Sequence, residues 1–120
     1  MWLTSPALRI FLARQPADLR KSFDGLCGLV RDVMKQEPTS GHLFVFRNKR
    51  ANRVKILYFD RTGLAIGYKR LELGNFSWPS GGESTVEMNS AEMMLLLEGI
   101  ELAGAKRRKR LRLPAVENRS

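Results

Sequence analysis

Residues 41–79 constrain the fold of this chain most, because three short apolar-alternating runs are separated there by turn-forming residues. Residues 42–46 and 53–60 are rich in Val, Ile, Phe and Tyr, which favour strands, and the polar residues between them indicate a hairpin turn. A third run, residues 64–71, follows a short turn in which Gly63 is expected to take a positive φ. The pattern predicts an antiparallel meander of three main strands.

The register of this meander decides which side chains share a face. With Phe46 opposite Arg53 and Asp60 opposite Leu64, one face collects apolar residues suited to a core: Leu43, Val45, Val54, Ile56, Tyr58, Leu64, Ile66 and Tyr68. The other face mixes large apolar and cationic side chains: Phe44, Phe46, Leu57, Phe59, Arg53, Lys55 and Lys69. Either a helix covers this second face while the cations reach past it to solvent, or the face stacks on nucleic-acid bases and contacts phosphates. A slip of one residue would undo the sorting.

The same segment is strongly basic, with eight cations against two anions and a net charge of +6. DNA is the expected partner of such a surface. The predicted phosphate-binding residues of the sheet and its hairpin tips are Arg47, Lys49, Arg50, Arg53, Lys55, Lys69 and Arg70.

A second basic block lies in residues 106–120, which we predict to be a tail that is disordered when free, because its charges repel one another. Its expected DNA contacts are Lys106, Arg107, Arg108, Lys109, Arg110 and Arg112. Phosphate contacts of this kind position a protein on DNA without sequence specificity. A solvated tail with no particular partner is the alternative.

Residues 76–105 are acidic, with five Glu and no Lys or Arg. Glu92, Glu98 and Glu101 are therefore candidates for contacting a basic protein partner. The alternative is that this block neutralises the basic tail within the molecule.

Apolar spacing predicts two helices outside the meander. Residues 23–34 carry apolar side chains at helical spacing, and Ser22 or Asp18 could cap a long core helix there. Gly25 and Gly28 are expected to let that helix lie close to a strand. Ser90 is the expected N-cap of a short C-terminal helix, and residues 9–13 and 84–89 indicate short extra strands.

Length and composition favour one soluble domain, residues 1–105, followed by the tail. A chain of 120 residues is long enough to bury a core without covalent staples. The single cysteine, Cys27, excludes an internal disulfide and does not fit a cysteine-rich zinc site. A chain without a disulfide framework suits the reducing cytoplasm, where we expect this protein. No apolar run reaches the roughly 18 to 20 residues of a membrane span, so no membrane association is expected.

Residues that could support catalysis are sparse, and we predict no enzyme activity and no cofactor. His42 is the single histidine, and no spacing brings it together with Cys27 and an orienting carboxylate. A metal-dependent nuclease would need converging carboxylates, for which only Asp60 and Glu72 lie in the basic segment. A phosphate-binding glycine loop of the GxxxxGK[ST] type does not occur.

Six blocks occur in order along the chain: PADLRKSFDGLCGL (16–29), SGHLFVFR (40–47), KILYFD (55–60), YKRLELG (68–74), FSWP (76–79) and LLLEGI (95–100). Together they resemble the TnpB-type accessory proteins of the insertion sequence 66 family, which are distinct from the RNA-guided nuclease of the same name. The resemblance covers residues 8–112. It implies a small bacterial protein that assists a separate transposase and contributes no catalytic residue.

These observations predict an α+β domain, in which one long helix packs on the meander and a short C-terminal helix precedes the basic tail. The expected function is accessory DNA binding in transposition. The alternatives are a protein-interaction subunit that binds the transposase with incidental DNA contact, and a metal-dependent nuclease.

Overall fold

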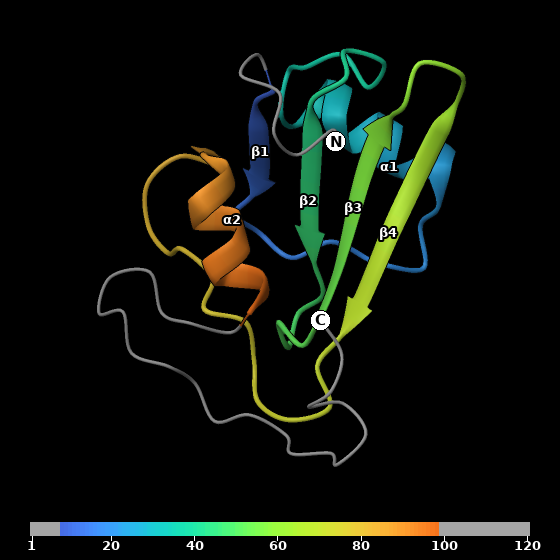
Figure 1. Ribbon diagram of the computed structural model, residues 1–120. Helices are drawn as coiled ribbons and strands as arrows, with labels where there is room; N and C mark the ends of the chain where they lie inside the picture. Colours follow the sequence, from blue (N-terminus) through green and yellow to red (C-terminus); the bar gives the residue numbers. More distant parts are fainter. Residues whose placement is uncertain (1–7, 99–120) are drawn as a thin grey trace.

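A computed structural model describes residues 8–98, which form a five-stranded mixed sheet with one helix on each face (Figure 1). The elements in chain order are β1 (Ile10–Ala13), α1 (Phe23–Asp32), β2 (Leu43–Arg47), β3 (Arg53–Phe59), β4 (Leu64–Arg70), β5 (Thr85–Met88) and α2 (Ser90–Leu97). The α+β class is confirmed. None of the helices within residues 8–98 has the length and apolarity that crossing a bilayer requires.

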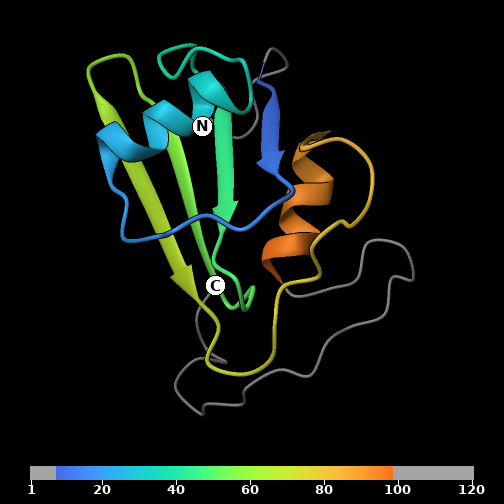
Figure 2. The ribbon, with the colours of Figure 1, turned by 180° about the vertical axis from the view of Figure 1, so that it is seen from behind.

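The strand order is β4-β3-β2-β1-β5. Strands β2, β3 and β4 pair antiparallel, so the predicted three-strand meander is confirmed. The two short extra strands join the same sheet, with β1 parallel to β2 and β5 antiparallel to β1. A parallel pair needs a crossover, and the segment that contains α1 makes it across one face (Figure 2).

The predicted registers are wrong by two residues in one hairpin and by one in the other. Phe46 lies opposite Lys55 instead of Arg53, a shift that leaves every side chain on its expected face. Leu64 lies opposite Phe59 instead of Asp60, which moves the alternate residues of β4 to the other face. Leu64, Ile66 and Tyr68 therefore share a face with Leu57, whereas Lys69 shares one with Val54.

The side chain of Asp60 explains the one-residue slip. Its Oδ1 accepts hydrogen bonds from the backbone N–H groups of Thr62 at 3.2 Å and Gly63 at 3.1 Å. These bonds hold Asp60 in the turn and lower the pKa of its carboxyl group. Arg61, with φ 86°, takes the left-handed conformation that was expected of Gly63. Pairing therefore starts one residue earlier, at Phe59.

Helix α1 covers the second face of the meander, as one of the two interpretations predicts. Leu26, Cys27 and Val30 pack there with the apolar residues of the sheet, Phe11, Phe44, Phe46 and Leu57. Two of the three aromatic residues proposed as a nucleic-acid platform are thus core residues, because Phe44 is 0% exposed and Phe46 1% exposed, whereas Phe59 is only half-buried. The platform interpretation of this face is wrong for the two buried rings.

Helix α1 is shorter than the long helix that the sequence predicts. It spans 10 residues and ends at Asp32, and Lys35 shortly after it has a left-handed φ of 56°. Ser22 occupies the N-cap position but makes no side-chain cap bond. A Cβ atom at Gly25 would lie 2.9 Å from the Lys21 side chain, whereas one at Gly28 would meet nothing within 4 Å. Neither glycine therefore serves close packing against a strand.

Helix α2 covers part of the opposite face. Its buried residues Met93 and Leu96 join a second core cluster with Ile10, Leu12, Leu43, Val45, Val54, Phe76 and Met88. Both faces of the central strands are therefore buried beneath a helix, which leaves little open sheet surface for a ligand. The solvent-facing functional groups lie at the ends of strands and on the outer strand β4.

The N-cap of α2 is Asn89, one residue before the expected Ser90. Its side chain accepts a hydrogen bond from the Glu92 N–H at 2.8 Å, and the Glu92 carboxylate accepts one from the Asn89 N–H at 2.9 Å. This reciprocal pair satisfies two N–H groups that the helix itself leaves unbonded.

Replacing Asn89 by Ala is expected to lower the free energy of unfolding by about 1 kcal/mol, because the helix loses its side-chain cap. Asn89→Ser keeps a capping oxygen and should retain most of the stability. Urea unfolding followed by circular dichroism measures both. Equal stability of the Ala variant and the parent chain would contradict a role for the cap.

Candidate nucleic-acid interface

The cations predicted to contact DNA divide between the two faces of the sheet. Strand alternation places Arg53, Lys55 and Arg70 on the α1 face, and Arg47 and Lys69 on the α2 face. Lys49 and Arg50 are exposed in the turn between β2 and β3. The sheet therefore does not present one continuous cationic face.

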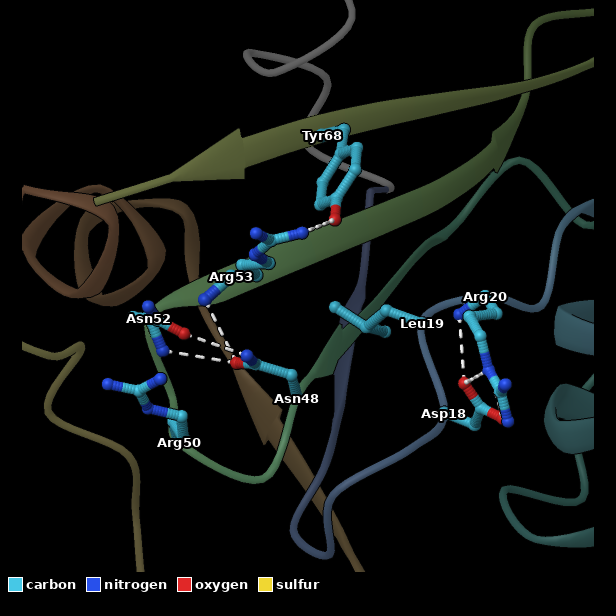
Figure 3. A pocket seen from close by; sticks show the side chains of 8 residues that line it. All are labelled: Asp18, Leu19, Arg20, Asn48, Arg50, Asn52, Arg53 and Tyr68. Carbon is cyan, nitrogen blue, oxygen red and sulfur yellow. Dashed lines mark hydrogen bonds and ion pairs between the residues drawn. The ribbon is translucent and has the colours of Figure 1, made fainter. Parts of the chain in front are cut away.

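Three arginines nevertheless line one open pocket of about 370 Å³, which we call the arginine pocket: Arg50 and Arg53 lie on one side, and Arg20, paired with Asp18, lies on the other (Figure 3). Its lining residues come from the segment before α1, the β2–β3 turn, β3 and β4: Asp18, Leu19, Arg20, Asn48, Arg50, Asn52, Arg53 and Tyr68. The lining carries three cations and one anion. It is therefore a local positive site in which Arg20 joins two of the predicted residues.

Two long-range hydrogen bonds bring Arg20 to this pocket. The Ala17 N–H donates to the Arg47 carbonyl at 2.8 Å, and the Lys55 ammonium donates to the Lys21 carbonyl at 2.8 Å. These bonds attach both ends of the short segment around Arg20 to the β2–β3 hairpin. Arg20 itself pairs with Asp18 at 2.8 Å, and its hydrogen bonds lower the pKa of that carboxyl to about 2.

The β2–β3 turn is held by Asn48. Its Oδ1 accepts from the backbone N–H groups of Asn52 at 3.1 Å and Arg53 at 2.9 Å, while its Nδ2 donates to the Asn52 side chain at 2.7 Å. The Asn75 side chain also donates to the Arg50 carbonyl at 2.7 Å. The backbone that carries Arg50 and Arg53 is thereby fixed, which reduces the ordering cost of binding an anion.

Arg47 is a structural residue in this arrangement. Its guanidinium donates to the carbonyls of Arg14 at 3.1 Å, Asn48 at 3.4 Å and Lys49 at 3.3 Å, and lies 5.8 Å from the Trp78 ring centroid. Partial burial lowers its pKa. Arg47 thus ties the end of β1 to the turn that carries Arg50.

Replacing Arg47 by Ala is expected to lower the free energy of unfolding by about 2 kcal/mol, because charge-assisted bonds to several carbonyls are lost. Arg47→Lys cannot reproduce the planar fork and should recover only part of this loss. Lys49→Ala, at an exposed neighbouring position, should change stability by less than about 0.5 kcal/mol. Urea unfolding provides the comparison, and equal effects of Arg47→Ala and Lys49→Ala would refute the structural role.

The remaining predicted cations of the sheet have protein partners. The Lys69 ammonium donates to the Leu97 carbonyl at 2.8 Å, at the C-terminal end of α2 where a helix favours positive charge. Arg70 pairs with Glu72 at 2.7 Å. Both side chains stay exposed, so a competing phosphate can reach them.

The acidic residues proposed to contact a partner differ in role. Glu92 is engaged in the α2 capping box, whereas Glu98 follows the helix as its C-cap residue. Glu101 lies outside the described residues, as do the predicted tail contacts Lys106, Arg107, Arg108, Lys109, Arg110 and Arg112.

The residues considered for catalysis are dispersed. The Nδ1 atom of His42 accepts the Arg9 N–H at 3.1 Å, and burial with the nearby Arg9 charge lowers its pKa. Cys27 is buried in the α1 core, where desolvation raises its pKa and makes the thiolate unfavourable. Asp60 and Glu72 lie beyond opposite ends of β4, about 20 Å apart at the usual strand rise, too far to share an ion. Residues 8–98 contain no group of three His, Cys, Asp or Glu side chains placed to hold a metal.

The sequence alone missed Tyr68, Asn48 and Asn52 as members of the site. Tyr68 was assigned to the core by the wrong β3–β4 register. Asn48 and Asn52 stand four positions apart, at the two ends of the polar turn. Asparagine at such positions commonly bonds the backbone of its own turn. The spacing of these two asparagines could have predicted that the hairpin tip is held in one conformation.

Comparison with known proteins assigns the chain to a family. The family model of the IS66 Orf2-like proteins matches residues 8–107, which include the whole sheet, both helices and the arginine pocket. The chain belongs to this family. Membership confirms the resemblance seen in the sequence and associates this IS66 Orf2-like protein with an accessory role in transposition.

Two curated relatives of the IS66 Orf2-like protein come from Sinorhizobium fredii. The uncharacterized protein y4jC is 36% identical over 104 residues, which cover 87% of this chain and 89% of y4jC. The uncharacterized protein y4hO is 34% identical over 94 residues, or 78% of this chain and 82% of y4hO. No solved structure matches the chain.

Proposed function

We propose that this IS66 Orf2-like protein is a non-catalytic DNA-binding subunit that assists a separate transposase. The observation that carries the proposal is the arginine pocket, where Arg20, Arg50 and Arg53 line one concave site with a single carboxylate, Asp18. Guanidinium groups match phosphate oxygens in a bidentate geometry, and their positive charge is retained at any physiological pH.

The pocket offers more than a diffuse positive charge. Within residues 8–98 the Arg50 side chain has no hydrogen-bond or ion-pair partner, and Arg53 bonds only the Tyr68 hydroxyl, at 3.2 Å. Both guanidiniums therefore keep most of their N–H donors for phosphates. Lys49, Lys55, Lys69, Arg70 and the cations of residues 106–112 extend the proposed DNA contacts, and Arg47 supports the turn beneath them.

The test is a salt titration of DNA binding by the full chain, with element-end DNA and scrambled DNA as ligands. Two phosphate contacts at the pocket, from Arg50 and Arg53, predict a slope of about −2 in log affinity against log salt, and six tail contacts add about −5. A variant lacking residues 106–120 should retain the pocket component. Absence of salt-sensitive binding by both forms would reject the proposal. Stronger binding to element ends than to scrambled DNA would show that the protein also recognises the DNA sequence.

A protein-interaction role is the second candidate, and the outer surface of α2 favours it. Met94 is 50% exposed and Leu95 38% exposed, which is unusual for large apolar side chains on a helix this short. The proposed partner is the transposase. Co-purification with the transposase should weaken in Met94→Lys and in Glu98→Lys, while unchanged association in both would argue against this surface. Glu92 is not suitable for the test, because its substitution also removes the α2 cap.

A further inference from the structure

Tyr68 places an accessible aromatic ring at the rim of the arginine pocket. It lies on β4, the outer strand of the sheet, and is 54% exposed, whereas Phe44 and Phe46 on the same face are buried under α1. In Figure 3 the ring stands above Arg53 on the side of the pocket away from Asn48 and Arg50. A half-exposed ring beside the guanidinium groups of Arg50 and Arg53, which keep most of their N–H donors, has an accessible surface for a flat ligand.

Cationic groups hold this ring without enclosing it. The Lys55 ammonium lies 5.1 Å from the ring centroid, and Arg53 Nη1 donates to the Tyr68 hydroxyl at 3.2 Å. Lys55 is fixed in turn by its bond to the Lys21 carbonyl. These contacts favour the observed orientation of the ring, so less side-chain entropy is lost when a ligand stacks on it.

The pocket beside Tyr68 also has a polar group suited to the edge of a base. Asn52 uses its Oδ1 to accept from Asn48, while its Nδ2 has no hydrogen-bond partner within residues 8–98. The volume of about 370 Å³ lies within the range of pockets that take small organic ligands. The pocket is thus lined by an aromatic ring, an amide donor and guanidinium groups, and it has room for one nucleotide.

We infer that the arginine pocket binds unpaired DNA, with Tyr68 stacking on a base and Arg50 and Arg53 contacting the neighbouring phosphates. This inference rests on the proposed DNA-binding function and adds the form of DNA that the site selects. Inside a duplex both faces of each base are covered by neighbouring pairs, so a protein ring stacks on a base most readily where that base is unpaired. The arginines alone would bind duplex and single strand with little distinction.

The test compares a single-stranded oligonucleotide with a duplex of equal length, using the full chain at one salt concentration. The parent chain should bind the single strand more tightly. Tyr68→Ala should lower single-strand affinity by roughly 5- to 100-fold, the usual effect of losing one stacked base, while duplex affinity stays within about twofold. Tyr68→Phe keeps the ring and should keep the preference.

Two further measurements separate stacking from a structural role of the ring. Thermal unfolding checks that each variant folds, and Tyr68→Leu replaces Tyr68→Ala if the smaller side chain unfolds the chain, since Leu retains apolar bulk without a stacking ring. Fluorescence quenching of a single-stranded probe that carries 2-aminopurine reports stacking directly. Quenching should occur with the parent chain and Tyr68→Phe, and should be lost in Tyr68→Ala or Tyr68→Leu.

The outcomes distinguish this inference from the function on which it rests. Salt-sensitive binding with no preference for single strands, or equal losses on both DNA forms in Tyr68→Ala, would overturn the stacking role and leave the proposed function intact. No binding of either DNA form by the parent chain would overturn both.

Discussion

Replacing Phe44 by Ala is expected to lower the free energy of unfolding by about 3–5 kcal/mol, the usual cost of truncating a fully buried phenylalanine. Phe44 lies on β2, the central strand, is 0% exposed, and stacks on Phe11 with ring centroids 5.8 Å apart. Its removal would leave a cavity between the sheet and α1 that the flanking strands cannot close. Since small domains have a total stability of about 5–15 kcal/mol, a large share of the molecules would unfold near body temperature.

Phe23→Ala is the matched control for this prediction. Phe23 begins α1 but is 42% exposed, so its truncation creates no cavity and should cost less than about 1 kcal/mol. Urea unfolding of both variants measures the difference. Similar losses in the two would mean that the α1 face of the sheet is not the packed core described above.

The double variant Arg50→Glu, Arg53→Glu is expected to reduce DNA affinity by about 100-fold at low salt, because two phosphate contacts are replaced by repulsion. The salt slope should become shallower by about 2 for the same reason. Both side chains are exposed, so the fold should remain, with a small loss from the Arg53 bond to Tyr68. Fluorescence anisotropy across a salt series measures affinity and slope together.

The control for the arginine variant changes net charge equally at another site. Arg31→Glu with Lys35→Glu alters exposed cations at and after the end of α1, and neither residue lines the pocket. If binding depended only on overall charge, both double variants would weaken it to the same extent. A much smaller effect of the control, about tenfold or less, is expected for a local site.

The meander was predictable because its signals are local. Strand-forming residues, period-two alternation and polar turns lie within one continuous segment, and each hairpin joins strands adjacent in sequence. The register was not predictable from the same pattern, because apolar residues on both faces of β3 and β4 fit either alignment. The hydrogen bonds of the Asp60 side chain decided it.

The arginine pocket was only partly predictable, since its members come from distant segments. Arg50 and Arg53 stood out through the basic composition of the hairpin. The helical phase predicts that Arg20 is exposed and could join the basic surface. Its place at this pocket depends on the bond from the Ala17 N–H to the Arg47 carbonyl, a contact between residues 30 positions apart that no local pattern reveals. Arg47 looked like a DNA contact in the sequence, and only its hydrogen bonds to three backbone carbonyls distinguish it from Arg50, whose side chain has no partner within residues 8–98.

The position of β4 at the edge of the sheet has a consequence for self-association. An unpaired strand edge offers N–H and C=O groups to any second chain, and lysine or arginine on such a strand opposes that pairing. Lys69 and Arg70 end β4, and at the other edge β5 is only four residues long. The same charges that we propose to contact DNA would therefore also oppose the addition of strands from a second copy of this chain.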